Sequence, residues 1–171
     1  MNKKQISFLF FYGIMKIGDE MKIFIGTDHR GLDVQNEIKS YLGELGIDVE
    51  ISKISHTEND DYPDFAFDVC KSVLTNPDSY GILICGTGIG MSIAANKVKG
   101  IRAARCTNID DAFFAKNHND CNVMCISNMI DIKIIYKMID TFLNTKRPSE
   151  QRHINRVNKI INYEKGAYNG L

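Results

Sequence analysis

From Met21 onward, short apolar runs alternate along the chain with longer segments in which apolar residues recur every three or four positions. The short runs predict five buried strands: KIFIG (22–26), IDVEI (47–51), GILIC (81–85), GIRAARC (100–106) and NVMCI (122–126). The periodic segments predict helices over residues 31–45, 65–75, 90–98, 109–117, 130–143 and 149–163, with Asp64 as the N-cap of the second.

Strands that are apolar on both faces and alternate with helices are typical of a parallel sheet covered on both sides. The pattern therefore predicts an α/β protein: a three-layer αβα sandwich with a five-stranded, parallel, doubly wound sheet of the Rossmann or flavodoxin type and a C-terminal helix. In such sheets the ligand binds beyond the carboxyl ends of the strands, near the point where the strand order reverses. Candidate chemistry is therefore expected at those ends.

The first twenty residues fall outside this alternation. Their apolar run, from Ile6 to Met15, is about half the ~20 residues that a membrane span requires. The small-residue cleavage site of a signal peptide is also missing. We therefore expect residues 1–20 to be a dispensable extension, residues 21–171 to form a single domain, and the protein to be cytoplasmic without membrane contact.

Composition narrows the function further. The 21 basic residues equal the 21 acidic ones, and this balance argues against a nucleic-acid partner. The five cysteines show no CxxC spacing, which suits a reducing compartment. Cys121 and Cys125 lie four positions apart, but no His or Asp is spaced around them as a zinc site requires, so we expect no metal.

Two predicted strands end in polar or glycine-rich segments. The first ends in GTDHRG, where Asp28 and His29 either enter the crevice or serve as a helix cap and a surface residue. The third ends in CGTGIG, whose alternating glycines free the backbone to aim N–H groups at an oxyanion. This segment is neither a dinucleotide fingerprint nor a P-loop, and its structural alternative is a tight turn. Cys85, at the start of a helix, is a candidate nucleophile or general base, because such a position tends to lower a thiol pKa.

Two further groups lie elsewhere in the sequence. His118 and Asn119 immediately precede the fifth strand, at the edge of the sheet opposite to Cys85 unless the helix is short or a second subunit brings them in. Arg152 and Arg156 are four residues apart on the last helix and so share a face. Two guanidinium groups on one face suit a phosphate, and a solvated basic face is the alternative.

Together, GTDHRG, DYPDFA, ICGTGIGMSIAANK, HNDCNV and RHINRV resemble the type B ribose-5-phosphate isomerases, from Met21 to about Ile160. These enzymes belong to a family that includes the galactose-6-phosphate isomerase subunits. The resemblance implies the same fold, a homodimer with active sites shared between subunits, a sugar-phosphate substrate and no cofactor. It also implies interconversion of ribose 5-phosphate and ribulose 5-phosphate through an enediolate, in the pentose phosphate pathway.

The resemblance also implies a role for each matching residue. Cys85 corresponds to the general base, while His118 and Asp28 correspond to residues that help to open the furanose ring. The remaining matches are substrate contacts: the enediolate pocket of Gly86, Thr87, Gly88, Ile89 and Gly90; phosphate contacts from His29, Arg152 and Arg156; sugar-oxygen contacts from Asn119; and Tyr62 bordering the ring.

One departure from the family pattern bears on the substrate. Met129 stands where the family usually has a substrate-binding arginine, so phosphate binding is weaker or is supplied by Arg105 or Lys116. The same change keeps a six-carbon sugar phosphate, such as galactose or allose 6-phosphate, as an alternative substrate. A non-catalytic sugar-phosphate-binding module is a second alternative. A redox role is disfavoured because Cys85 has no resolving cysteine nearby.

Overall fold

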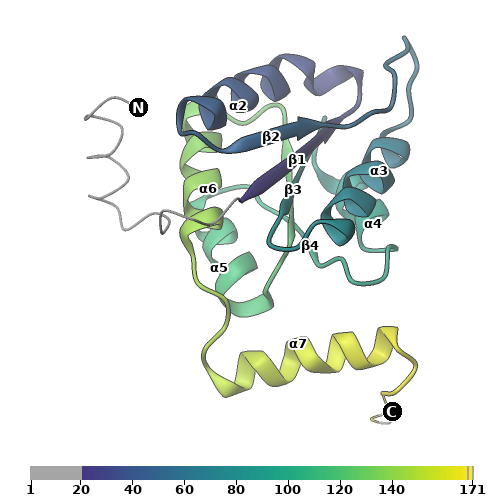
Figure 1. Cartoon of the computed structure of the whole chain (residues 1–171), viewed down its shortest axis with the longest axis vertical. Coiled ribbons are helices and arrows are strands. Elements are labelled where there is room, and N and C mark those ends of the chain that lie inside the picture. Colours follow the sequence, from purple (N-terminus) through teal and green to yellow (C-terminus); the bar gives the residue numbers. More distant parts are fainter. Residues whose placement is uncertain (1–20, 169, 171) are drawn as a thin grey trace.

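The computed structural model describes residues 21–168 and 170, and their centre is a five-stranded parallel sheet (Figure 1). Its strands lie in the order β2-β1-β3-β5-β4. Their bounds are β1 Lys22–Thr27, β2 Asp48–Ile51, β3 Tyr80–Cys85, β4 Ala103–Arg105 and β5 Val123–Ser127. All four pairings are parallel, so the predicted doubly wound sheet is confirmed.

Helices cover both faces of this sheet and complete the predicted sandwich. The α-helices are α2 Leu32–Glu44, α3 Tyr62–Thr75, α4 Ile89–Ala95, α5 Ile109–Asn119, α6 Ile132–Asn144 and α7 Gln151–Glu164, and a short 3₁₀ turn, η1, spans His29–Gly31. One buried core joins the sheet to α2, α5 and α6 through residues such as Ile38 and Phe142. A second core joins it to α3 and α4 through residues such as Phe65 and Met91.

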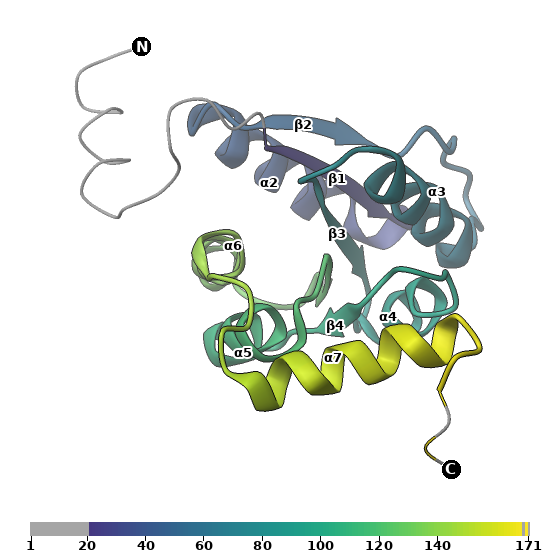
Figure 2. The ribbon, with the colours of Figure 1, turned by 60° about the horizontal axis from the view of Figure 1, so that its bottom comes forward.

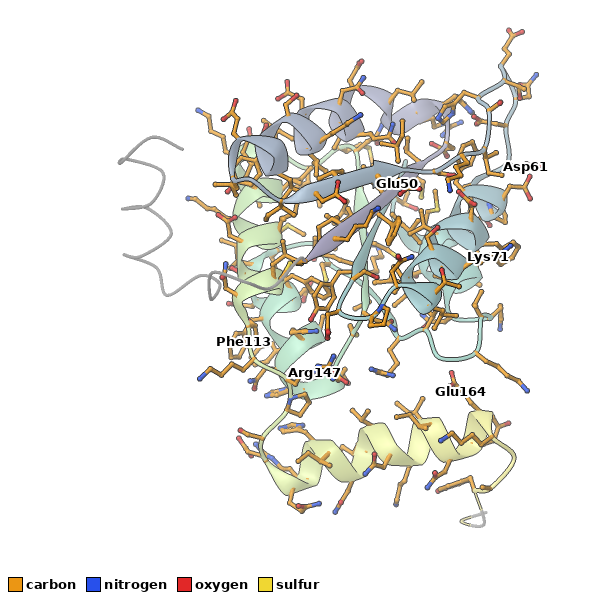
Figure 3. All side chains as sticks on the ribbon, in the orientation of Figure 1. Glu50, Asp61, Lys71, Phe113, Arg147 and Glu164 are labelled. Carbon is orange, nitrogen blue, oxygen red and sulfur yellow. The ribbon has the colours of Figure 1, made fainter. Side chains whose placement is uncertain are left out.

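Helix α7 lies outside these layers, alongside α5 (Figures 1 and 2). It buries His153 and Val157. Near its other end, the Glu164 carboxylate accepts a hydrogen bond of 3.1 Å from the Gly100 N–H, in the loop between α4 and β4. Glu164 points from α7 toward the rest of the domain in Figure 3. Helix α7 is therefore anchored at both ends near the loops that precede β4 and β5.

The structure corrects two of the predicted element boundaries. Helix α3 begins at Tyr62 rather than Phe65, and its N-cap is Asp61, so the assignment of Asp64 as the cap was wrong. Pro63 lies in the first turn of α3. A proline fits there because the N–H that it lacks would have no partner in the first turn of a helix. Strand β4 has three residues where seven were predicted: just before it, the Arg102 N–H donates to the Asn122 side chain rather than to a neighbouring strand, while the Asn96 side chain bonds to Ala103 on the open edge of the sheet.

The described helices include none that is both long and apolar enough to cross a bilayer. The extension predicted at residues 1–20 lies outside the described residues.

Candidate active site

The carboxyl ends of β1 and β3 meet at the centre of the sheet, where the strand order reverses. Thr27 pairs with Ile84. Asp28, which follows β1, and Cys85, the last residue of β3, therefore lie at the same level of the sheet. β2 lies on one side of the β1–β3 pair, and β5 and β4 lie on the other side. The strand order therefore reverses between β1 and β3, and doubly wound sheets bind ligands at such a switch point.

Cys85 is held by the turn that follows it. Its side chain is 5% exposed, and the Gly88 N–H donates a 3.2 Å hydrogen bond to its Sγ. Gly88 has a φ of +74°, and a Cβ added there would lie 3.0 Å from the carbonyl carbon of Ile126. A glycine is therefore required at this position for both conformation and space. The result is a thiol placed directly against the backbone N–H of Gly88.

The rest of the glycine turn carries Thr87 and touches Tyr62. The Ile89 N–H donates to Thr87 Oγ1 at 3.3 Å, and Arg105 Nε donates to the Thr87 carbonyl at 2.8 Å. A Cβ on Gly90 would lie 2.6 Å from the Tyr62 ring, so that ring rests directly on the glycine. The structure thus brings Tyr62, from the start of α3, to the turn that follows β3.

Asp28 and His29 lie beside this turn, and His29 is part of a network that the sequence did not reveal. Asp28 is 7% exposed and caps η1 by accepting the Arg30 N–H at 3.0 Å. One Asp60 oxygen accepts the His29 N–H at 2.9 Å and lies 2.7 Å from His29 Nδ1, while the other lies 2.7 Å from His56 Nδ1.

Asp60 is ionised in this network. Burial opposes the charge, but hydrogen bonds from His29 and His56 outweigh it and lower the pKa of Asp60 to about 2. Because a carboxylate only accepts hydrogen bonds, both rings donate from Nδ1, and Nε2 of His29 remains for other partners. No sequence spacing pointed to Asp60, which lies 31 residues from His29.

His118, Asn119, Arg152 and Arg156 form a separate group. His118 and Asn119 end α5, before β5 begins, so within one chain the length of that strand, about 15 Å at 3.3 Å per residue, separates their level from that of Cys85. The structure therefore does not bring these residues to Cys85 in one chain.

Within this second group, His118 contacts the arginine-bearing helix through His153. The two imidazole rings stack with their centroids 3.9 Å apart. Burial and the nearby His118 and arginine charges lower the pKa of His153, whose buried Nε2 makes no hydrogen bond to described residues. Arg152 pairs with Glu150 at 2.8 Å, and both arginines are exposed. His153 stood in the quoted RHINRV motif, but no spacing assigned it a role.

Arg105 and Lys116 were the two residues considered as substitutes for the arginine that the family usually has in place of Met129. Lys116 lies in a different environment from Arg105. Lys116 is 2% exposed, and its Nζ lies 4.0 Å from the centroid of the Tyr80 ring. It lines a pocket of about 200 Å³ at the amino ends of the strands, where Arg102 and Arg147 pair with Asp120. Within one chain Lys116 therefore cannot serve the Cys85 turn.

The other four cysteines are buried in the two cores. Burial raises the pKa of Cys70, Cys106 and Cys121 to about 12, and it raises that of Cys125 as well. These thiols stay protonated and suit packing rather than reaction. Among the described residues, no cluster of three His, Cys, Asp or Glu side chains is arranged to hold a metal ion.

A doubly wound sheet with a thiol and a glycine turn at its switch point is typical of α/β proteins that bind a small ligand at the carboxyl edge of the sheet. Comparison with known families is more specific. Residues 23–160 match the family model described as Ribose/Galactose Isomerase. The chain belongs to this family of isomerases.

Individual relatives span nearly the same length. A probable ribose-5-phosphate isomerase B from Mycoplasma pneumoniae is 39% identical over 84% of this chain and 95% of its own. Ribose-5-phosphate isomerase B from Escherichia coli is 38% identical over 84% and 96%. The crystal structure of the Mycoplasma genitalium ribose-5-phosphate isomerase B with bound ribulose-5-phosphate is 41% identical, with a TM-score of 0.79 over 85% of this chain and 97% of that one.

Proposed function

We propose that this protein interconverts ribose 5-phosphate and ribulose 5-phosphate, with Cys85 as the proton-transferring base. The observation that carries the proposal is the 3.2 Å hydrogen bond that places the Cys85 sulfur against the Gly88 N–H, inside the Gly86–Gly90 turn. The names of the relatives, and the ribulose-5-phosphate bound to one of them, support the choice of substrate.

The proposed chemistry needs a base and an oxyanion site close together. The Cys85 thiolate removes the proton from C2 of the open-chain aldose, and the electron pair forms a C1–C2 double bond as the negative charge moves to O1. Backbone N–H groups of the turn stabilise this enediolate. A proton moves from O2 to O1, and Cys85 returns its proton to C1, which leaves a ketone at C2. No proton or electron is gained or lost overall.

Other residues bind and open the sugar in this proposal. Asp28 and His118 assist ring opening, and Tyr62 borders the sugar ring on the side of Gly90. The phosphate is held by His29 and by Arg152 and Arg156, while Asn119 contacts sugar oxygens.

The active form in this proposal is a homodimer whose sites draw on both subunits. Cys85 and His118 lie at opposite edges of one sheet, so a site that contains both requires two chains. Helix α7 carries exposed Arg152 and Arg156 next to His118, and a partner subunit can therefore receive all three as one group. We place the enzyme in the pentose phosphate pathway and in the cytoplasm.

The direct test uses the purified full-length chain and ribose 5-phosphate. Proton NMR should show ribulose 5-phosphate accumulating to equilibrium without added cofactor, and Cys85→Ala should not catalyse this. If wild-type protein leaves ribose 5-phosphate unchanged while it binds the sugar, the chain is a binding module instead.

A six-carbon substrate is the second candidate, because Met129 is 75% exposed at the carboxyl edge and carries no charge. The same NMR assay with allose 6-phosphate and galactose 6-phosphate tests it. A higher kcat/KM for either sugar than for ribose 5-phosphate would reassign the substrate.

A further inference from the structure

Arg30 lies between the two loops that build the Cys85 site. Its N–H donates to Asp28 Oδ1 at 3.0 Å, and its carbonyl accepts a 2.6 Å hydrogen bond from Asn128 Nδ2, in the loop after β5. A Cβ added to Gly86 would lie 3.5 Å from Arg30 Nη1 and 3.9 Å from its Cδ. The Arg30 side chain therefore extends from a fixed backbone along the start of the Gly86–Gly90 turn.

The guanidinium of Arg30 has unused hydrogen-bonding capacity. Arg30 is exposed, and no hydrogen bond or ion pair to its guanidinium is found within residues 21–168 and 170. Arg105 at the same edge differs, because its Nε is already bonded to the Thr87 carbonyl. A guanidinium that is close to a ligand turn and has no protein partner is available to a ligand.

The charges around Arg30 indicate which ligand group it meets. Asp28 and the ionised Asp60 are carboxylates at this edge, and they repel an incoming phosphate. His29 and His56 are both hydrogen-bonded to Asp60. At this edge, Arg30 and Arg105 both carry guanidinium groups beside the Gly86–Gly90 turn, and Arg105 already donates to the Thr87 carbonyl. Arg30 therefore brings a positive charge to the start of the turn, next to Asp28.

We propose that Arg30 binds the phosphate group of the substrate and is a specificity-determining residue for phosphorylated sugars. The proposal rests on the proposed function for the identity of the substrate. The planar guanidinium donates two parallel N–H groups to two phosphate oxygens, a geometry that lysine cannot reproduce.

Binding of inorganic phosphate tests the role of Arg30 without requiring turnover. Phosphorus NMR titrations would compare full-length wild-type protein with Arg30→Gln, and Lys39→Gln on the exposed face of α2 is the matched control for loss of one charge. We expect Arg30→Gln to weaken phosphate binding by about 10-fold or more and Lys39→Gln to leave it unchanged. Equal binding by wild type and Arg30→Gln would overturn the proposal, whether or not the protein isomerises ribose 5-phosphate.

Kinetics with ribose 5-phosphate separate phosphate binding from a role in the chemical step. Arg30→Gln should raise KM by about 10-fold or more and leave kcat within about threefold of the wild-type value. The KM of Arg30→Lys should lie between those of wild type and Arg30→Gln. A large fall in kcat at an unchanged KM would instead place Arg30 at the enediolate and contradict the assignment to phosphate. Since Arg30 is exposed, thermal unfolding should show all three variants folded.

Discussion

At the residue scale, the structure distinguishes one thiol from four others. All five thiols are buried, but Cys85 stands at the end of β3 and its sulfur accepts the Gly88 N–H. Burial raises the pKa values of the other four, Cys70, Cys106, Cys121 and Cys125. The same residue type thus has two uses in this chain, and the difference comes from the neighbouring backbone rather than from the cysteine itself.

Replacing Cys85 with serine tests its role as the base. Serine has a similar size but a far less acidic group, and within residues 21–168 the hydrogen bond to this position comes from the Gly88 backbone rather than from a basic side chain. We expect Cys85→Ser to fold and bind substrate while kcat falls by about 100-fold or more, the low end of what a positioned base contributes. Cys121→Ala, in the core, should keep its kcat. If Cys85→Ser turned over at nearly the wild-type rate, the base would lie elsewhere.

Asp60 gives a second prediction at this scale, through the pH dependence of stability. Its pKa is lowered to about 2 in the folded protein from an ordinary 3.8, so the folded state binds fewer protons than the unfolded state between these values. Its contribution, roughly 2 kcal/mol, is therefore present above pH 4 and is lost as the pH falls toward 2.

Urea unfolding of wild type and Asp60→Asn from pH 2 to 7 would measure this contribution. The stability difference should be largest near pH 7 and should shrink below pH 4. Asp61→Asn is the matched control, because Asp61 caps α3 without a side-chain hydrogen bond. A difference independent of pH would show that Asp60 does not act through its charge.

At the element scale, α7 is amphipathic and presents its arginines outward. His153 and Val157 are buried toward the domain, while Arg152 and Arg156 are exposed. The i,i+4 spacing that aligns the two guanidinium groups is a property of any helix. Their proximity to His118 depends on how α7 packs on α5.

Removing either arginine of α7 should mainly weaken substrate binding. A charge-assisted hydrogen bond to phosphate contributes roughly 1.5–3 kcal/mol, so Arg152→Ala and Arg156→Ala should each raise KM by about 10-fold or more. Steady-state kinetics with ribose 5-phosphate would measure this, with Lys137→Ala on the exposed side of α6 as the control. Normal KM values in both variants would make the arginines a solvated face.

At the scale of the whole molecule, the candidate site is divided between two edges of one sheet. Cys85, Asp28 and His29 lie at the carboxyl edge, and His118 lies at the level where β5 begins. Neither group is complete by itself for the proposed chemistry, and the homodimer that we propose would join them.

Complementation between inactive variants tests the shared site. Mixing Cys85→Ala with His118→Ala should create mixed dimers in which one of the two sites has both wild-type residues. With random exchange, half of the dimers are mixed, so about a quarter of wild-type activity should return. Native mass spectrometry would verify the exchange. No recovery in the presence of mixed dimers would show that each site is built from one chain.

The fold was largely predictable because its signals are local. Apolar runs and helical periodicity predicted the five strands, and the glycine turn after Cys85 predicted a ligand site at a strand end. The boundaries that failed depend on contacts beyond the local pattern: the Arg102 N–H, just before β4, donates to the side chain of Asn122, 20 residues away, rather than to a neighbouring strand.

The sequence alone determined the type of fold and the residues at each strand end, because backbone propensity and side-chain periodicity act over a few residues. Only the tertiary structure decided which of those residues meet. It paired His29 with Asp60 across 31 positions, buried Lys116 under the Tyr80 ring, and set Arg30 beside Gly86. Such contacts depend on strand order and on how helices pack, and these are set by the burial of the whole core rather than by any short segment.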